Sequence, residues 1–442
     1  MGQRRRSKGP VGPPSDRKNQ GSGRGKPGTN KPGAGRDRPE RDVVASVQPG
    51  RGEWVVNGYS QTWLKKGFPW VYPDEVVSRG KGGGTVLVRG PSGDVLGRAV
   101  PDEGWIAARV YRYDHGPIDR EWVGSLLDRA AALRELIIDP ETTGYRLVNA
   151  ENDGLAGLRV DVWAHTVVLT LDSPAVAVVV DDVVAWLIEH LFPKAIYLCY
   201  RPDPRDDRDF DSVEPAPGLL HGHHPPGDIR VTEHGMGMLV RPSEGPDVGM
   251  YADMRAVRRW LEPYWGGRSV LNTFAYTGAF SVAAAMGGAM EVVTVDLSSR
   301  YLERAEANFV ANDLEPGLYD FLAEDTFKVL DRFRRQGRRF DVVIVDPPSF
   351  SHAKEGTWSA KRDFPRLVAA ACRVLQSGGW LVAASNHGQT SPRDFRGWIS
   401  EGARRANVSA QELAWLGQAP DFPAATSFPE GRYLKVGVWR IG

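Results

Sequence analysis

Cysteine is scarce in this chain, which has two cysteines, Cys199 and Cys372, among 442 residues. Each lies in an apolar stretch, so both are expected to be core thiols in a reducing compartment, which excludes a disulfide framework. No apolar run is long enough to span a bilayer, and the arginines near the N-terminus have no apolar core behind them. Neither a membrane anchor nor a secretory signal is therefore expected, and a cytoplasmic protein is predicted.

The chain also lacks a strong net charge, which is +1 at pH 7. The overall balance therefore does not indicate a nucleic-acid partner, and any such indication has to come from local patches. Residues 1–41 form one such patch, because they are rich in Gly, Pro, Arg and Lys and poor in large apolar side chains. This composition predicts a disordered basic tail that attracts phosphates without reading sequence. A solubilising tail without a partner is the alternative.

Sets of metal ligands at suitable spacing are lacking as well. His221, His223 and His224 lie close together in a polar segment, residues 201–227, but no cysteine or acid pair completes a set. The segment is predicted to be a solvated loop, and no metal is expected.

Two smaller units are predicted before the last part of the chain. Residues 42–115 contain short strand-like segments between Gly and Pro clusters, which favours a small β-barrel. Within it, residues 67–72 place aromatic rings after two lysines, a combination that suits single-stranded RNA, although the rings could instead fill the barrel. Residues 116–235 combine two helical segments with several strands and are predicted to form an α+β middle domain.

From residue 269 strands and helices alternate, which predicts a doubly wound parallel sheet within a domain of residues 236–442. Its first strand leads through a tight loop into a helix at residues 269–281. The loop has one glycine, so it is not the dinucleotide fingerprint, but the free N–H groups of the helix can still hold a carboxylate.

Acids follow or end the next three strands of this predicted sheet, at Asp296, Asp325 and Asp346. Ligands of open α/β sheets bind at the carboxyl ends of the strands. The three acids therefore predict a nucleoside cofactor lying across this edge, with its ribose at Asp296 and its adenine at Asp325. For Asp296 a helix N-cap is the alternative.

The strand before Asp346 stops abruptly at Asp346-Pro347-Pro348-Ser349-Phe350. Proline fixes φ and has no N–H, so the strand cannot continue as a central one. The rigid turn leaves backbone carbonyls and the Asp346 carboxylate to accept hydrogen bonds from the edge of a flat base, with Phe350 to stack on its face. An ordinary end of a strand is the alternative.

These motifs together resemble a known family. Residues 250–442 resemble the class I S-adenosylmethionine-dependent methyltransferases, which have a Rossmann-like fold. Residues 45–442 resemble the bacterial large-subunit rRNA methyltransferases that carry a PUA-like RNA-binding domain in front. The resemblance is carried by residues 272–280, 296–298, Asn308, Asn312, Asp325, residues 346–350, residues 429–435 and, in the middle unit, residues 147–161.

The resemblance implies S-adenosyl-L-methionine as the cofactor and ribosomal RNA as the partner. It implies cofactor binding by Asn272, Phe274, Tyr276, Thr277, Gly278, Asp296, Leu297, Asp325 and Thr326. On the acceptor side it implies Asp346, Pro347, Pro348 and Phe350 at the centre, with Ser349, His352 and Asn386 as further contacts to the substrate.

The identity of the acceptor follows from a residue that is absent. Carbon-5 of cytosine needs prior addition of a cysteine thiolate, and relatives that make 5-methylcytosine carry a cysteine just after the fifth strand, where this chain has Asn386. The Ser385-Asn386 pair is similar to members that methylate a guanine nitrogen, so a ring or exocyclic nitrogen of guanine is predicted. The alternatives are cytosine C5, a protein or small-molecule acceptor, and a non-catalytic RNA-binding protein. The target nucleotide and the oligomeric state stay open, a homodimer being one alternative.

Overall fold

The computed structural model describes residues 48–82, 84–201, 203, 213–245, 248–348, 352–353, 356–357 and 360–442. The predicted basic tail, residues 1–41, lies outside the described residues. Ser349 and Phe350 of the acceptor turn also lie outside them, as does the side chain of His352.

The first sheet has six strands in the order β2-β6-β5-β4-β1-β3, with β1 parallel to β4 and the other pairs antiparallel. Among the described strands the two outer ones, β2 and β3, do not pair with each other. The closed barrel expected from the sequence is therefore not confirmed. The elements are β1 (Glu53–Val56), α1 (Gly58–Leu64), β2 (Trp70–Val71), β3 (Val76–Arg79), β4 (Val86–Arg89), β5 (Val95–Pro101) and β6 (Ala108–Arg112).

The aromatic residues around β2 are packing residues. Phe68 and Tyr72 are buried, and the ring of Trp70 lies 4.7 Å from the ring of Phe428, which comes from near the C-terminus. Trp70 also donates a hydrogen bond to Glu151 Oε1 at 2.8 Å. This part of the structure agrees with rings that fill a core, rather than with an open stacking platform for RNA.

The second sheet has five strands in the order β11-β10-β9-β8-β7. Strand β11 falls inside residues 201–227, so the prediction of a loop throughout that segment was wrong: it pairs antiparallel with β10. His224 lies just beyond β11, and its Nδ1 is 2.8 Å from the hydroxyl of Tyr197. The elements are α2 (Arg120–Ile137), β7 (Gly144–Asn149), β8 (Leu158–Trp163), β9 (Thr166–Leu171), α3 (Val180–Leu191), β10 (Ala195–Tyr200) and β11 (Gly218–Gly222).

A hairpin of β12 (Ile229–Glu233) and β13 (Met236–Val240) follows, and it straddles the boundary expected between residues 235 and 236. Asn308 and Asn312, two residues that carry the family resemblance, connect this hairpin to α6 (Ser299–Val310) and to the turn after it. Asn308 Oδ1 accepts from Leu239 N at 2.8 Å, and Asn312 Oδ1 accepts from Gly237 N at 2.7 Å.

The third sheet has seven strands in the order β16-β15-β14-β17-β20-β22-β21. The five strands from β16 to β20 are parallel. Strands β22 and β21 extend one edge, where β22 pairs antiparallel with both β20 and β21. The predicted doubly wound α/β architecture is confirmed. The strands are β14 (Ser269–Thr273), β15 (Glu291–Asp296), β16 (Asp320–Ala323), β17 (Phe340–Val345), β20 (Leu375–Ser385), β21 (Ala410–Leu416) and β22 (Lys435–Ile441).

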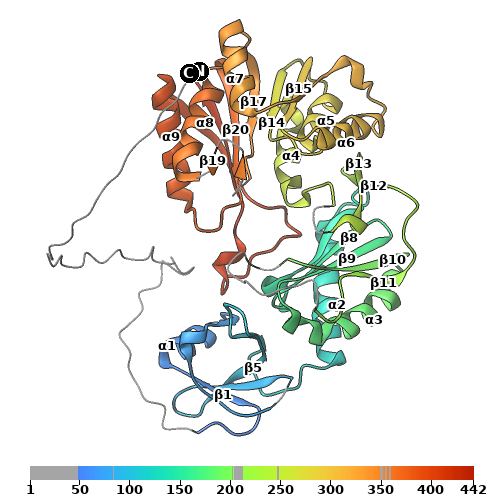
Figure 1. Cartoon of the computed structure of the whole chain (residues 1–442), viewed down its shortest axis with the longest axis vertical. Helices are drawn as coiled ribbons and strands as arrows, with labels where there is room; N and C mark the ends of the chain where they lie inside the picture. Colours follow the sequence, from blue (N-terminus) through green and yellow to red (C-terminus); the bar gives the residue numbers. More distant parts are fainter. Residues whose placement is uncertain are drawn as a thin grey trace, which may run out of the picture. The chain divides into compact units, whose positions relative to one another are not determined.

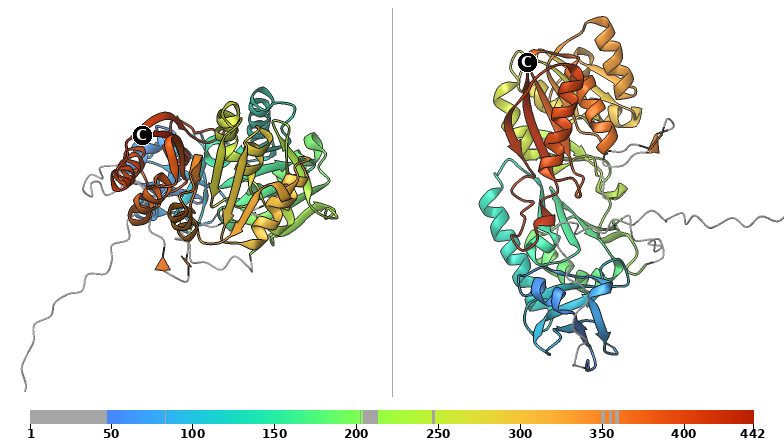
Figure 2. Two further views of the ribbon diagram at one scale, coloured as in Figure 1. Left: turned by 90° about the horizontal axis from the view of Figure 1, so that it is seen from above. Right: turned by 90° about the vertical axis from the view of Figure 1, so that its left-hand side faces the viewer.

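Helices cover both faces of this sheet, as Figures 1 and 2 show. Side chains of β17 alternate between the faces: Val342 and Ile344 pack with α4 and α5, whereas Val343 and Val345 pack with α7, α8 and α9. The helices are α4 (Arg255–Leu261), α5 (Ala279–Met286) and α6 (Ser299–Val310) on the first face, and α7 (Thr326–Gln336), α8 (Ala360–Cys372) and α9 (Pro392–Ala406) on the second. A short hairpin, β18 (His352–Ala353) and β19 (Gly356–Thr357), precedes α8.

Residues 417–434, which join β21 to β22, leave the third sheet and run against the other two; we call them the C-terminal strap. Asp421 Oδ2 accepts from Arg146 N at 2.9 Å, and Asn149 Nδ2 donates to Pro423 O at 2.8 Å, so the strap is bonded to β7. Phe428 then packs against Trp70 of the first sheet. Through the strap, residues distant in the sequence come together beside the start of β22.

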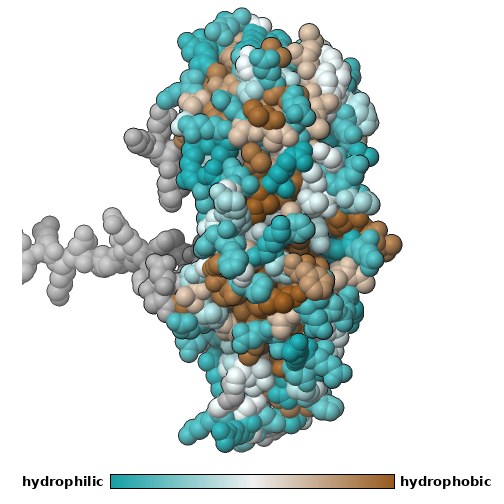
Figure 3. All heavy atoms as spheres, turned by 90° about the vertical axis from the view of Figure 1, so that its right-hand side faces the viewer, coloured by the Kyte–Doolittle hydropathy of each residue, from teal (hydrophilic) through white to brown (hydrophobic). Residues whose placement is uncertain are grey.

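Large apolar side chains on the surface belong to several separate elements. On the face shown in Figure 3, hydrophilic residues cover most of the area and apolar residues gather at mid-height. Over all described residues, whichever face they lie on, the most exposed large apolar side chains are Leu136, Phe192, Met290, Leu297 and Leu318. Single exposed residues of this kind are ordinary for folded proteins. No helix among the described residues is long and apolar enough to cross a membrane.

Candidate cofactor and acceptor site

The site lies at the carboxyl ends of the parallel strands. In the sheet register Thr273 of β14 is beside Val295 of β15 and Val345 of β17, so the residues that follow these strands emerge at one edge. The order of the strands reverses between β14 and β17, and ligands of open α/β sheets bind at such a switch point.

The loop after β14 has a backbone conformation unusual for its residues. Phe274 and Tyr276 have positive φ angles of 55° and 52°, and Gly278 has a φ of 78°. A Cβ at Gly278 would stand 2.9 Å from the Cβ of Ala305, so glycine also allows α5 to approach α6. The tight course of this loop leaves the N-terminus of α5 at the edge of the sheet.

Two predicted cofactor residues, Asn272 and Thr277, are buried and hold this loop from behind. Asn272 Nδ2 donates to Ser281 Oγ at 3.0 Å, and Thr277 Oγ1 donates to Gly249 O at 2.5 Å. Asn308 Nδ2 adds a bond to Thr277 O at 2.8 Å. These polar side chains position the loop.

Asp296 ends β15 and binds the same loop. Its Oδ2 accepts from Tyr276 N and its Oδ1 from Ser298 N, both at 2.9 Å. Burial raises the pKa of Asp296, and the backbone N–H groups around it act in the opposite direction. The N-cap of α6 is Ser298, so the alternative that Asp296 caps this helix is wrong. Leu297 is 69% exposed on the rim beside it.

Asp325 stands two residues after β16 and is the N-cap of α7, where its Oδ1 accepts from Lys328 N at 3.1 Å. Capping engages this one oxygen of a partly buried carboxylate. The next residue, Thr326, is buried. Asp325 therefore joins Asp296 at the same edge of the sheet while it also begins a helix.

Asp346 follows β17 and is partly buried. Among the described residues its carboxylate accepts no hydrogen bond. Burial and the nearby charge of Asp253 raise the pKa of Asp346 to about 7, against the opposing effect of Arg258. Pro347 is buried and Pro348 exposed, so the turn leaves the sheet at once. A carboxyl group of this kind can exchange a proton near neutral pH.

The carboxyl end of β20 lies next to that of β17 at this edge of the sheet. Asn386 is exposed there, and His387 Nδ1 is 2.7 Å from Thr390 Oγ1. The buried ammonium of Lys435 donates to His387 O at 3.0 Å and to Tyr433 O at 2.6 Å. Burial lowers the pKa of Lys435 to about 8. This lysine ties the end of β20 to the end of the strap.

No role in the site was assigned to Asp253 or to Tyr433 from the sequence. Asp253 lies in a turn of 3₁₀ helix, Ala252–Met254, before α4, and its Oδ2 accepts a hydrogen bond from Tyr433 Oη at 2.7 Å. Tyr433 belongs to residues 429–435, so the family resemblance was the available signal for it.

These donor and acceptor groups fit S-adenosylmethionine. Asp296 and Asp325 offer carboxylate oxygens to ribose hydroxyls and an adenine amino group, and the start of α5 offers N–H groups to a carboxylate. Acidic side chains around the edge also favour a positively charged sulfonium.

Comparison with known proteins agrees with this chemistry. A family profile described as S-adenosylmethionine-dependent methyltransferase matches residues 218–432. Ribosomal RNA large subunit methyltransferase I of Shewanella amazonensis is 35% identical over 384 residues, which cover 86% of this chain and 96% of that protein. The protein of the same name from Aliivibrio fischeri is 33% identical over 391 residues, with the same shares covered.

A solved structure is similar over almost its whole length. It is the crystal structure of a methyltransferase candidate complexed with SAH, with a TM-score of 0.79 and 25% identity. The match covers 88% of this chain and 99% of that one. The chain belongs to the S-adenosylmethionine-dependent methyltransferases.

Proposed function

We propose that this methyltransferase modifies ribosomal RNA at a ring or exocyclic nitrogen of guanine. The proposal of an rRNA substrate is supported by the names of the relatives that align with 86% of the chain. In this proposal residues 42–115 are a PUA-like RNA-binding domain, residues 116–235 the middle domain and residues 236–442 the catalytic domain. The basic residues 1–41 add attraction to phosphates, and the enzyme works in the cytoplasm.

The choice of guanine over cytosine C5 rests on the burial of the two cysteines. Cys199 is in β10 and Cys372 is the last residue of α8; both are buried, and burial raises their pKa values to about 11 and about 12. Both thiols therefore stay protonated at neutral pH, and neither supplies the thiolate that cytosine C5 requires. At the end of β20 the chain has Asn386, which cannot form a covalent adduct.

In the proposed mechanism this chain mainly aligns the reactants. Bound S-adenosylmethionine supplies an electrophilic methyl group. The Asp346 turn, with Pro347, Pro348 and Phe350, holds the acceptor base so that its nitrogen lone pair points at that methyl. As the N–C bond forms and the S–C bond breaks, an acceptor N–H proton passes to Asp346. Asn386, Ser349 and His352 are proposed to contact the substrate at the rim.

The test is transfer of tritiated methyl groups to rRNA, followed by hydrolysis to nucleosides and mass spectrometry. The expected product is a methylguanosine, with cell protein and small metabolites unlabelled. Formation of 5-methylcytidine by the purified enzyme would overturn the choice of base. Labelling of protein in place of rRNA would overturn the choice of substrate.

Asp296→Asn is expected to weaken S-adenosylmethionine binding about 10- to 100-fold, because hydrogen bonds donated to a charged acceptor each contribute about 1.5–3 kcal/mol. Isothermal titration calorimetry measures the change. Asp313→Asn is the matched control, since Asp313 is exposed and asparagine tolerates its positive φ of 58°. An unchanged Kd for Asp296→Asn would remove Asp296 from the cofactor site.

The pH dependence follows from Asp346. Its carboxyl has a pKa of about 7, so the acceptor form is lost as pH falls through that value. We expect kcat/KM to decrease about tenfold per pH unit below about pH 7 and to level off above it. The profile of Asp346→Asn should be flat over this range. A wild-type profile without a break between pH 5 and 8 would contradict the role of Asp346.

A further inference from the structure

Asp253 and Tyr433 form a carboxylate–phenol pair that the proposed mechanism does not use. The hydroxyl of Tyr433, at the end of the strap, donates to Oδ2 of Asp253 at 2.7 Å. The backbone carbonyl of Asp253 also accepts from Ala419 N, at the start of the strap, at 2.8 Å. Among the described residues the other carboxylate oxygen, Oδ1, accepts no hydrogen bond. Asp253 is therefore held on one side and left with a free acceptor.

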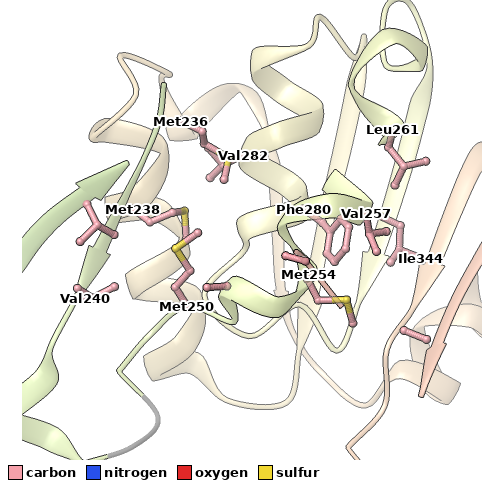
Figure 4. Packing of buried hydrophobic residues seen from close by; sticks show 14 of the residues in the cluster. Met236, Met238, Val240, Met250, Met254, Val257, Leu261, Phe280, Val282 and Ile344 are labelled. Carbon is pink, nitrogen blue, oxygen red and sulfur yellow. The ribbon is translucent and has the colours of Figure 1, made fainter. Parts of the chain in front are cut away.

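The packing of β17 places this pair beside Asp346. Alternate residues of a strand point to the same face, so Asp346 follows Val342 and Ile344 on the side toward α4. There Ile344 belongs to the same buried cluster as Met254 and Val257, the group that Figure 4 shows. Met254 is the residue after Asp253. The two acids thus come from adjoining elements on one side of the sheet edge.

Electrostatics agree with this placement. Asp253 lies close enough to raise the pKa of Asp346, and burial raises the pKa of Asp253 itself. Two arginines, Arg146 and Arg258, lower the pKa of Asp253, whereas Asp421 raises it. The turn that holds Asp253 also adjoins the cofactor loop, because the rings of Tyr251 and Tyr276 lie 5.1 Å apart.

The nearby arginines do not turn the surroundings of Asp253 into a donor site. Arg258 is bonded to Glu233 through two hydrogen bonds, and Arg146 to Asp161 in the same bidentate manner. What Asp253 and Asp346 offer a base is therefore carboxylate oxygen. Of the four bases, guanine alone presents two adjacent N–H donors on its Watson–Crick edge, at N1 and at the 2-amino group. Adenine, cytosine and uracil place an acceptor next to their donor there.

We propose that Asp253 is a specificity-determining residue, whose free Oδ1 faces the acceptor base beside Asp346 so that the two carboxylates together receive the N1–H and 2-amino groups of guanine. Tyr433 is the positioning residue that fixes the orientation of Asp253. This inference rests on the proposed function and deepens it, because it states which edge of the base is recognised. It also explains why the strap has to return to the edge of the sheet before β22 begins.

The test pairs a substitution in the protein with one in the RNA. A synthetic rRNA segment containing the unmodified target guanosine is compared with the same segment containing inosine, which lacks the 2-amino group but keeps N1, the nitrogen that this arrangement makes the methyl acceptor. Methylation of the 2-amino group itself by the wild-type enzyme would overturn the inference. For the wild-type enzyme we expect kcat/KM to fall about 10- to 100-fold with inosine, the cost of leaving a buried carboxylate oxygen unpaired. For Asp253→Asn we expect the guanosine segment to react more slowly and the ratio between the two segments to shrink to about threefold or less. Tyr433→Phe, which keeps the carboxylate, should give an intermediate ratio.

Calorimetry with S-adenosylmethionine separates this role from a structural or cofactor role. A Kd for Asp253→Asn within about threefold of wild type, with an unchanged thermal midpoint, supports the inference. A large loss of cofactor affinity would assign Asp253 to the cofactor and overturn it. If Asp253→Asn keeps the wild-type ratio of kcat/KM between guanosine and inosine, the inference is overturned as well. The proposed function would still stand in that case, provided that the wild-type product is methylguanosine. A wild-type product other than methylguanosine overturns the proposed function, and the inference falls with it.

Discussion

Asp346→Asn is expected to reduce kcat about 10²- to 10³-fold, the range in which a positioned general base contributes. Asparagine keeps the size of the side chain and one acceptor oxygen, so the base can still bind. It cannot take up the proton that leaves the acceptor nitrogen. The loss should therefore appear mainly in kcat, measured as single-turnover methyl transfer to rRNA, while the Kd for S-adenosylmethionine changes little.

The stability of this variant distinguishes a lost proton acceptor from a damaged fold. The folded-state pKa of Asp346 is raised from its usual value of 3.8 to about 7, so stability falls as pH rises between these two values and the full cost of ionising the group is present above about pH 7. Asparagine removes this cost together with the repulsion from Asp253. At pH 8 we expect the thermal midpoint of Asp346→Asn to equal or exceed that of the wild type. Asp181→Asn, at an exposed position of α3, is the control for both measurements.

A drop of less than about fivefold in kcat would contradict the proton-acceptor role and leave Asp346 as a hydrogen-bonding residue only. A variant that is inactive and also less stable would point to a structural role. The two measurements together therefore decide between chemistry, recognition and folding.

The strands and acids of the third sheet could be predicted because their signals are local. Each strand is a short apolar run in the sequence. Asp296 ends one such run and Asp346 directly follows another, so their positions at the strand ends can be predicted without knowledge of long-range contacts. Asp325 follows the same logic, although its service as the N-cap of α7 shows that one carboxylate can have a structural role as well.

What the sequence could not show depends on contacts between distant segments. Asp253 and Tyr433 are 180 residues apart, and their hydrogen bond exists because the strap runs back across the second sheet. The aromatics at residues 67–72 suggest RNA stacking until Phe428 is seen to pack on Trp70. Strand β11 is short and carries histidine and glycine, and it is a strand because β10 offers it an edge. In each case tertiary packing decides between two structures that local composition allows.

One of the bonds that anchor the strap is a buried ion pair. Asp421 is fully buried and paired with Arg255, which is 3% exposed. Its Oδ2 also accepts from Arg146 N at 2.9 Å, and its backbone carbonyl accepts from Arg134 Nη2 at 2.8 Å. Beyond Asp421, Arg255 has a hydrogen bond to Gly144 O at 3.1 Å. Without the carboxylate, Arg255 would be a buried cation with no ion-pair partner among the residues that the structure describes.

Asp421→Ala is therefore expected to destabilise the protein by about 3–5 kcal/mol, the cost of breaking a buried pair from one side. Urea unfolding followed by tryptophan fluorescence measures the change. Asp94→Ala is the matched control, since the Asp94–Lys65 pair is about half exposed, with 52% of each side chain accessible, and should change stability by no more than about 0.5 kcal/mol.

A double-mutant cycle tests the cause. Arg255→Ala should cost a similar amount, and the double variant with Asp421→Ala should cost clearly less than the sum, because the second change removes the charge that the first left unpaired. Additive losses would mean that Asp421 stabilises the strap through its bond to Arg146 N rather than through the ion pair. In either case the loosened strap releases Tyr433, so the remaining folded enzyme should discriminate less between guanosine and inosine. Full discrimination in a destabilised Asp421→Ala would show that the position of Tyr433 is independent of this anchor.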